Sequence, residues 1–421
     1  MMKTFRINAW IRLIPVSCLG VSAIAETENW NGFRGPDRTG VSSESDWVVW
    51  DDDSPKIEWT AEVGKGFSTV VPFEGRVYTM GNTSDTDTVF CLDAETGREI
   101  WTFSYDCIAN RKAFFGPRST PAVDYNHVYT MSWTGQIHCL DVRTGEPVWV
   151  KTNKDYGIEG RFGYEFPNWG LSGSPLVHGD LVYFDAGTFF AVNRKTGEKK
   201  WELDGLHSAY SSPMIFEDES GRSRLATLTT QGLVVADAGD GTVLSRYPWT
   251  TMGDANCVVP IVRDDTLFIS SGWKVGAALL RPSELEAELL WKNTNMANAL
   301  NSCVLIDDHL YGFNGQVSDY GGEIRCMKLS SGELTWKHEG LGVGSLIAAG
   351  GRLIVLSESG ELVIADADPT SFRIRARAQV LENTCWTAPT ISKGLIYCRD
   401  MGGKVVCINA RKESPPPGDE E

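Results

Sequence analysis

The sequence lacks the residue patterns that would identify metal, thiol-redox or nucleophilic chemistry. No CxxC pair occurs among its ten cysteines, so a zinc ribbon or a redox dithiol has no support. Its six histidines include no HExxH or HxH pair, so no histidine metal site is predicted. The segment GLSGS (170–174) ends in Ser174, where a nucleophile elbow has Gly.

Basic residues are outnumbered by acidic ones. The chain holds 39 Lys and Arg against 55 Asp and Glu, and its formal net charge is −16. Nucleic-acid binding needs a basic surface, so nucleic acid is excluded as a general partner. Beyond the first 25 residues, no stretch is apolar enough to span a bilayer, so no transmembrane helix is expected in the mature protein.

The N-terminus has the layout of an export signal. Its first twelve residues carry basic and no acidic side chains, an apolar stretch follows, and Ala23–Ala25 fits a small-x-small cleavage rule. We therefore predict a signal peptide over 1–25 and a protein that is exported, either periplasmic or secreted. An uncleaved anchor and lipid attachment at Cys18 are alternatives, but Pro15 disfavours both.

One phrase is repeated along the chain. It occurs as LDAETGREIW (92–101), LDVRTGEPVW (140–149), VNRKTGEKKW (192–201) and MKLSSGELTW (327–336). A repeated phrase is normally a structural unit and not a catalytic motif. In each copy an apolar run ends in a polar turn, Gly supplies the positive φ that the turn needs, and a Trp follows in an alternating strand.

The turn-opening position marks eight units, spaced about 45 residues apart. These positions are Asp93, Asp141, Asn193, Asp237, Pro282, Lys328, Asp366 and Asn409. Two further short strands precede each phrase, which makes four antiparallel strands per unit. Units four, five and seven are degenerate. Cys91, Cys139, Cys326 and Cys407 recur at one equivalent place, which predicts buried thiols and not disulfides.

The two ends of the array complement each other. Unit eight stops at Asn409 without a fourth strand, and PKIEWTAEV (55–63) is a fourth strand, with Trp59, that has no unit of its own. We predict an all-β fold, an eight-bladed β-propeller of four-stranded antiparallel blades over 55–410, closed by the N-terminal strand completing the last blade. A β-helix or open solenoid is the rival. Residues 26–54 form an N-terminal extension, and 411–421 a disordered, acidic, Pro-rich tail.

Long, irregular loops link the units, and in a propeller they share one face with the loops that follow second strands. Such a face is the usual place for binding. Candidate partner-binding residues on it are Arg118, Arg161, Trp169, Tyr210, Trp273, Asn301 and Trp386, and Trp249 and Asn298 belong to the same predicted face. They predict either a funnel that holds a ligand by stacking and hydrogen bonding, or aromatics that pack together and plug the channel.

The repeated LDxxTGxxxW phrase resembles the pyrroloquinoline-quinone (PQQ)-like repeat. That repeat builds quinoprotein dehydrogenases and the propeller lipoprotein of the outer-membrane barrel-assembly machine. The segments NWNGFRGPDRTGVS (29–42), FGPRSTPAV (115–123) and CWTAP (385–389) are similar to exported bacterial proteins of this group. The match covers almost the whole mature chain, but the repeat is structural and serves many functions.

The resemblance implies two functions of different kinds. One is a non-catalytic binding or scaffold module of the bacterial cell envelope, expected to be a monomer, whose partner is a protein, peptide or glycan. The other is a PQQ- and calcium-dependent oxidoreductase. The dehydrogenases cover their quinone with a disulfide between adjacent cysteines, and this sequence has no adjacent pair. No cofactor and no catalytic residue are therefore predicted, with PQQ and calcium as the alternative.

Overall fold

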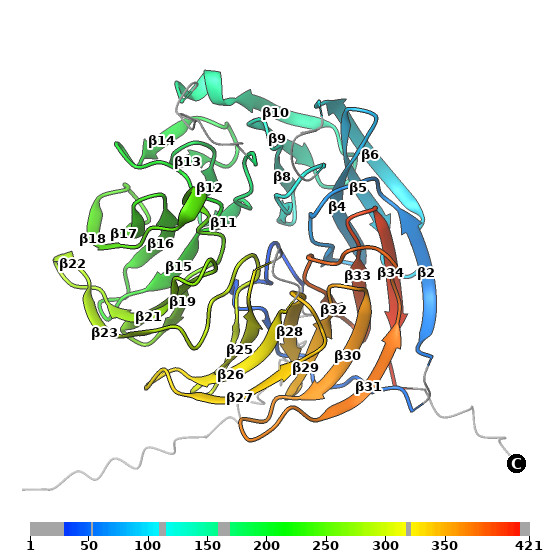
Figure 1. Cartoon of the computed structure of the whole chain (residues 1–421). Helices are drawn as coiled ribbons and strands as arrows, with labels where there is room; N and C mark the ends of the chain where they lie inside the picture. The colour runs from blue at the N-terminus through cyan, green and yellow to red at the C-terminus, as the bar shows by residue number, and fades with distance from the viewer. Residues whose placement is uncertain (1–28, 52–53, 109–114, 159–168, 317–320, 413–421) are drawn as a thin grey trace, which may run out of the picture.

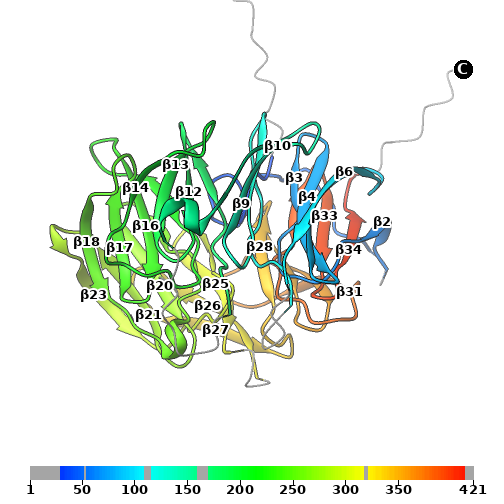
Figure 2. The ribbon, with the colours of Figure 1, turned by 90° about the horizontal axis from the view of Figure 1, so that it is seen from above.

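The computed structural model describes residues 29–51, 54–108, 115–158, 169–316 and 321–412, and nearly all regular structure in them is β-strand. Antiparallel sheets follow one another around a central axis (Figure 1). Turned by 90°, the strands run from one face of the ring to the other, so the loops gather on two faces (Figure 2). The predicted eight-bladed β-propeller is confirmed.

The first four blades follow chain order, and the fourth carries a fifth strand. Blade 1 is β3 (Val71–Phe73), β4 (Arg76–Thr83), β5 (Thr86–Asp93) and β6 (Glu99–Asp106); blade 2 is β7 (Ala122–Val123), β8 (His127–Met131), β9 (Gln136–Asp141) and β10 (Pro147–Thr152), followed by the 3-10 turn η1 (Asn153–Tyr156). Blade 3 is β11 (Leu176–His178), β12 (Leu181–Asp185), β13 (Phe189–Asn193) and β14 (Lys199–Glu202); blade 4 is β15 (Met214–Glu217), β16 (Ser223–Thr229), β17 (Gly232–Asp237) and β18 (Val243–Pro248), extended by β22 (Leu285–Glu286).

The last four blades draw on both ends of the chain. After η2 (Met252–Asp254), blade 5 is β19 (Ile261–Arg263), β20 (Thr266–Ser271), β21 (Gly276–Arg281) and β23 (Glu288–Asn293); blade 6 is β24 (Val304–Ile306), β25 (His309–Asn314), β26 (Glu323–Lys328) and β27 (Leu334–Glu339). Blade 7 is β28 (Ser345–Ala349), β29 (Arg352–Leu356), β30 (Glu361–Asp366) and β31 (Ile374–Gln379), extended by β1 (Val41–Ser42); blade 8 is β32 (Thr390–Ser392), β33 (Leu395–Arg399), β34 (Lys404–Asn409) and β2 (Lys56–Glu62).

The N-terminal strand closes the ring, as predicted. β2 lies antiparallel to β34, with Trp59 opposite Cys407. Figure 1 shows the blue β2 beside the red β34, next to the blue strands of blade 1. The predicted signal peptide (1–25), with Cys18, and most of the predicted tail (411–421) lie outside the described residues. Within the described part of the chain, no helix has the length and apolarity needed to cross a membrane.

The recurring cysteines occupy the predicted equivalent position. Each stands directly opposite the repeat Trp on the neighbouring strand, in the pairs Cys91–Trp101, Cys139–Trp149, Cys326–Trp336 and Cys407–Trp59. All four thiols are buried and free. The prediction of buried thiols at a small apolar position is therefore confirmed.

In most blades the repeat Trp joins the blade to the next. The Trp59 indole of blade 8 lies against Gly97 in the last turn of blade 1, where a Cβ would come within 2.6 Å of the ring. Its Nε1 donates to the carbonyl of Ala94 at 2.9 Å. Trp101, Trp149, Trp291 and Trp336 donate in the same way to the following blade. Each indole buries a large apolar area with its one polar group satisfied.

Two junctions lack the Trp and are filled by inserted segments. In blade 4 the position belongs to Ser245, and β22 from the blade 5 loop adds a parallel strand there, with Ser245 opposite Leu285. In blade 7 it belongs to Ala376. Trp47 and Trp50 of the N-terminal extension pack into the same apolar cluster as Ala376. The neighbouring Val48 N–H donates to the carbonyl of Ala410 in blade 8 at 2.8 Å.

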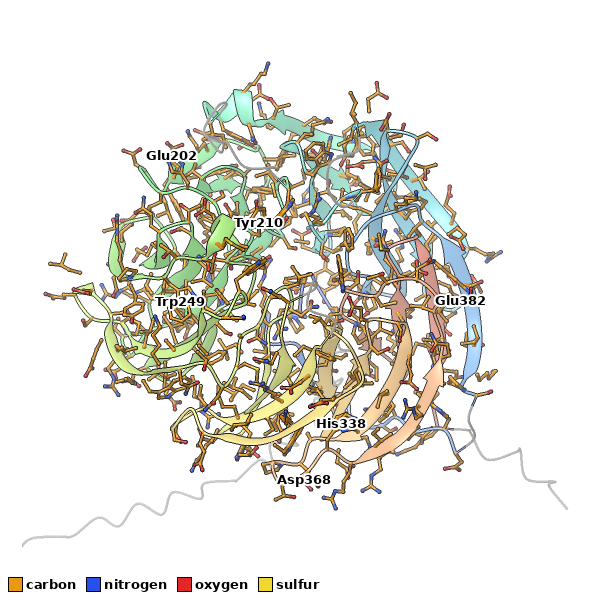
Figure 3. The ribbon with its side chains drawn as sticks, in the orientation of Figure 1. Glu202, Tyr210, Trp249, His338, Asp368 and Glu382 are labelled. Atoms are coloured by element: carbon orange, nitrogen blue, oxygen red, sulfur yellow. The ribbon has the colours of Figure 1, made fainter. Side chains whose placement is uncertain are left out.

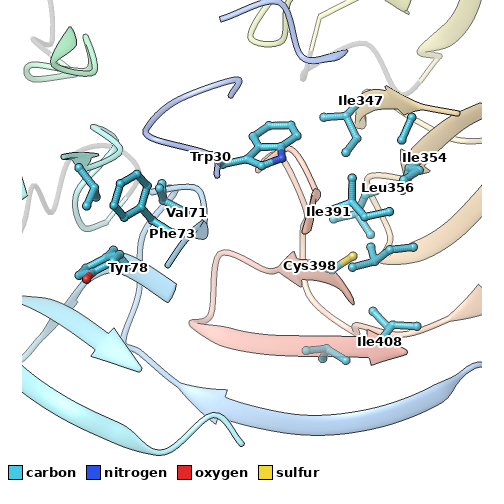
Figure 4. Packing of buried hydrophobic residues seen from close by; sticks show 14 of the residues in the cluster. Trp30, Val71, Phe73, Tyr78, Ile347, Ile354, Leu356, Ile391, Cys398 and Ile408 are labelled. Atoms are coloured by element: carbon cyan, nitrogen blue, oxygen red, sulfur yellow. The ribbon is translucent and has the colours of Figure 1, made fainter. Parts of the chain in front are cut away.

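Residues 29–42, which we call the N-terminal plug, lie across the inside of the ring (Figure 1). Trp30 N–H donates to Pro72 in blade 1, and the Asn31 carbonyl accepts from Val123 in blade 2. β1 pairs with β28 in blade 7. Figure 4 shows Trp30 between blade 1 residues such as Phe73 and blade 7 residues such as Ile347.

We predict that substituting Gly97 by Ala destabilises the protein far more than substituting Gly75 by Ala. Both glycines are in blade 1 with φ of 68° and 73°, so both variants carry about 1 kcal/mol of backbone strain. Only at Gly97 would the new methyl meet Trp59; no atom lies within 4 Å at Gly75. Overpacking adds about 1–3 kcal/mol. Denaturant unfolding measures the stability of both variants. Equal losses of stability would contradict the docking role of Trp59.

Candidate functional site

A cavity of about 320 Å³ lies at the centre of the ring, where the inter-blade loops meet. Most of its lining comes from residues just before the inner strands of the blades. It is lined by Phe33, Phe67, Thr69, Arg118, Trp169, Ser172, Ser174, Tyr210, Ser212, Cys257, Trp273, Leu300, Asn301, Gln316, Trp386, Thr387 and Ala388. Its size and its mainly apolar and aromatic wall are typical of small-ligand sites.

Six of the seven candidate residues line this one cavity: Arg118, Trp169, Tyr210, Trp273, Asn301 and Trp386. Arg161 lies outside the described residues. Two further residues of the predicted face lie elsewhere. Trp249 is 2% exposed and packs between blades 4 and 5, and Asn298 is 1% exposed. That the six residues bind a partner stays a prediction.

The aromatic side chains pack in pairs and leave the cavity between them. The Phe67 and Trp386 rings are stacked with their centroids 5.7 Å apart. The Trp169 and Tyr210 rings are tilted, also with centroids 5.7 Å apart. Figure 3 shows Tyr210 toward the middle of the ring. The structure thus has a feature of each predicted arrangement. The rings pack on each other, as in the predicted plug, and still surround a cavity, as in the predicted funnel.

Hydrogen bonds hold the cavity wall in place. Trp386 Nε1 donates to Glu358 Oε1 at 3.1 Å, and Asn301 Nδ2 donates to the carbonyls of Gly344 and Trp386 at 3.0 and 3.1 Å. Trp273 has a φ of +52°, which is unusual for a bulky side chain. The chain accepts that strain in the β20–β21 turn, which places the indole over the cavity.

A belt of hydroxyl groups links the inner strands below the aromatic pairs. The backbone N–H of Thr69 donates to Thr120 Oγ1, that of Thr120 to Ser174 Oγ, and that of Ser174 to Ser212 Oγ, at 2.9–3.0 Å. Each bond joins two consecutive blades. The belt is interrupted at the next blade, where Val259 carries no hydroxyl. These bonds hold the inner edges of blades 1 to 4 together beside the cavity.

The N-terminal plug closes the base of the cavity. Phe33 contributes to the lining. Arg34 donates to the carbonyls of Ser302 and Cys303 in front of blade 6. Arg38 donates to those of Ser174, Pro175 and Pro213 in front of blades 3 and 4.

Arginines are the charged side chains that the described residues place in the cavity wall and in the plug below it, although the chain as a whole is acidic. Arg118 is the one charged side chain among the described lining residues. Burial lowers the pKa values of Arg118 and Arg34 to about 10 and that of Arg38 to about 9, so all three stay protonated at neutral pH. Within the described chain, Arg34 and Arg38 form no ion pair with a carboxylate.

Sequence reasoning missed Phe33, the two plug arginines and the hydroxyl belt. The belt had a local signal, because STP (119–121), GSP (173–175) and SSP (211–213) recur just before inner strands. The plug residues had no such local signal, because nothing in the sequence of residues 29–42 indicates which blades they contact.

The lining does not fit the quinone and calcium that the alternative function requires. None of the described lining residues is a carboxylate, whereas calcium sites are normally built around Asp or Glu oxygens. The described residues contain no group of three or more His, Cys, Asp or Glu side chains able to hold a metal. The absence of a cofactor stays a prediction, and we derive no reaction step from this group.

The fold and cavity define a β-propeller whose blades are joined by docked Trp side chains. Its central cavity, on the face formed by the inter-blade loops, has the size and lining of a small-ligand site. The chain belongs to the family described as outer membrane protein assembly factor BamB, whose model matches residues 39–153, 108–338 and 320–413. No curated protein sequence matches the chain.

Solved structures with the same fold differ widely in their names. BamB from Moraxella catarrhalis is 14% identical with a TM-score of 0.61, over 85% of this chain and 100% of that one. The quinohemoprotein alcohol dehydrogenase from Comamonas testosteroni is 15% identical with a TM-score of 0.68, over 93% and 82%. The computationally designed Ika8 protein is 11% identical with a TM-score of 0.59, over 83% and 98%. At these identities the similarity shows the fold alone.

One buried carboxyl behind the cavity wall should make stability depend on pH. Asp185, at the end of β12, accepts from Ser208 Oγ and lies against Gly173, and burial raises its pKa to about 7. An unfolded Asp titrates near 4. Between these values the folded state holds a proton that the unfolded state has released, so stability falls as pH rises from about 4 to 7 and then levels off.

We predict that Asp185→Asn, which is neutral at every pH, removes this dependence. The stability of the wild type relative to the variant should fall by up to about 1.4 kcal/mol per pH unit between pH 5 and 7. Urea unfolding at several pH values measures the difference. A difference that does not change with pH would show that Asp185 is ionised in the folded protein.

Proposed function

We propose that this protein is an exported, non-catalytic binding module of the bacterial cell envelope, and that its partner binds on the face that opens into the central cavity. The family match and the BamB neighbour support an envelope role. The observation that carries the proposal is the gathering of Arg118, Trp169, Tyr210, Trp273, Asn301 and Trp386 around one cavity.

The composition of the site favours recognition over chemistry. Aromatic rings, amide groups and hydroxyls form most of the polar and stacking surface of the lining. Aromatic and Arg side chains are also the residues that contribute most to binding at interfaces. No described lining residue is a carboxylate or His that could exchange a proton near neutral pH.

The quinoprotein oxidoreductase is the second candidate, because a quinohemoprotein dehydrogenase shares the fold. Adding PQQ and calcium to the purified protein distinguishes the two. Quinone absorbance that persists through gel filtration, together with dye reduction by alcohols or sugars, would show that the protein is the enzyme and not the binding module.

The binding face is tested with a photo-crosslinking amino acid at two matched aromatic positions. Phe115 is 38% exposed on the cavity face beside Arg118, and Tyr125 is 70% exposed in the β7–β8 turn on the opposite face. In envelope extracts, we expect a discrete crosslinked species from position 115 and none from position 125. The species should disappear when Arg118, Trp169 and Trp386 are replaced together by Ala.

The triple variant must still fold, which its thermal unfolding and circular dichroism report. Unlabelled wild-type protein should compete for the crosslink, whereas the folded triple variant should not. Equal crosslinking from both positions, or full competition by the triple variant, would mean that the partner binds elsewhere.

A further inference from the structure

Three hydroxyl groups in the cavity wall have hydrogen-bonding capacity that the described protein does not use. Thr69, Ser174 and Ser212 line the cavity and are only 2–3% exposed. Ser174 Oγ and Ser212 Oγ each accept from a backbone N–H, but no described residue accepts from either hydroxyl. Thr69 bonds through its backbone N–H, and its Oγ1 forms no hydrogen bond with a described residue. Because a hydroxyl can both donate and accept, these groups are able to bind a ligand.

Two amide side chains of the wall offer acceptors. Asn301 donates through Nδ2 to the carbonyls of Gly344 and Trp386, and no described residue donates to its Oδ1. Gln316 Oε1 is buried and has no partner among the described residues. Both side chains line the cavity. A polar group without a hydrogen bond costs free energy when it is buried, so water or a ligand has to complete it.

The charged side chain of the wall is already engaged within the protein. Arg118 Nη1 donates to the carbonyl of Gly116 at 3.5 Å. Burial lowers the pKa of Arg118, and electrostatic interactions with Tyr210 and Asp87 oppose that shift. The polar groups that the described wall leaves for a ligand are therefore the uncharged hydroxyls and amides.

The first aromatic pair lies beside two of these groups. The rings of Phe67 and Trp386 are stacked, with centroids 5.7 Å apart. Thr69 follows Phe67 by two residues, and Asn301 is bonded to the backbone of Trp386. One side of the cavity thus combines a flat apolar surface with an unused hydroxyl and an unused amide oxygen.

The second aromatic pair repeats this arrangement. Trp169 and Tyr210 pack with centroids 5.7 Å apart, and Ser212 follows Tyr210 by two residues. The face of an aromatic ring carries partial negative charge, so it attracts polarised C–H groups. Apolar walls with a few placed polar groups are the usual make-up of a small-ligand site.

We infer that the cavity binds an uncharged sugar ring, with its C–H face against Trp386 and its hydroxyls at Thr69 and Asn301. A pyranose presents both surfaces that the wall requires, because its C–H groups form an apolar face and its hydroxyls a polar rim. A flat aromatic molecule would match the rings but leave the wall hydroxyls unpaired. The inference rests on the proposed function, since it names the chemistry that the same face recognises.

A panel of methyl pyranosides of glucose, galactose, mannose and N-acetylglucosamine tests the wild-type protein. We expect at least one to bind with a Kd of about 10 mM or lower, measured by tryptophan quenching and saturation-transfer NMR. Its uronate analogue carries a carboxylate on the same ring and should bind no more tightly. This arm needs no variant to fold.

Oligomers of the sugar that binds distinguish a free sugar from the end of a glycan. An affinity that rises at least about tenfold from the monomer to the trimer identifies a glycan, and an unchanged affinity identifies a free sugar. Either result supports the inference, because both ligands place the same ring in the cavity.

Matched variants assign the binding to the cavity. Thr69→Val keeps the shape of the side chain, removes its hydroxyl and should weaken sugar binding at least about fivefold. Thr227→Val makes the same change at a buried hydroxyl without a partner in blade 4, outside the described lining, and should leave the affinity unchanged. Trp386→Leu should also weaken binding, through loss of the aromatic surface. Thermal unfolding checks that each variant is folded.

Three results would overturn the inference. They are no binding of any panel sugar up to about 50 mM, a uronate that binds at least about tenfold more tightly than its neutral parent, and equal affinities of the two Thr→Val variants. Failure of the proposed function is recognised separately, because crosslinking at position 115 reports a macromolecular partner whether or not a sugar binds.

Discussion

The structure depends on the docking of a Trp from one blade onto the glycine turn of the next. Trp59 shows what the contact needs: a turn residue without a side chain at Gly97, and the carbonyl of Ala94 as acceptor for the indole N–H. A four-stranded blade cannot bury both of its faces alone, so each blade is stabilised by its neighbours. Because Trp59 lies on β2, which pairs with the C-terminal strand β34, the same contact docks blade 8 onto blade 1 and closes the ring.

The two blades that lack the repeat Trp show how a junction between blades is filled without it. At Ser245 and Ala376 no indole is available, and these are the junctions where β22 and the segment around Trp47 are inserted. The N-terminal extension therefore has a structural task in addition to closing the channel. It fills a junction that the degenerate seventh unit leaves open, and its earlier residues form the base of the cavity.

The cavity exists because the N-terminal plug closes one end of the central channel. A ring of eight blades leaves a channel that is too wide for its inner strands to fill. The plug closes it from one side, and the inter-blade loops narrow it from the other. The result is a largely aromatic cavity, with Arg118 as its charged side chain among the described lining residues, inside an acidic protein. The same fold occurs in BamB, an alcohol dehydrogenase and a designed protein, so the fold by itself does not fix a function.

The sequence by itself determined what is local and periodic. The spacing of the turn-opening positions predicted the blade count, the orphan strand around Trp59 predicted the closure, and loop placement predicted the face shared by Arg118, Tyr210 and Trp386. Only the tertiary structure decided which loop residues meet. Trp249 packs in a blade interface, Phe33 lines the cavity, and Arg34 and Arg38 bond to carbonyls more than a hundred residues away. Such contacts depend on the three-dimensional path of a segment without a repeat, and no local spacing encodes that path.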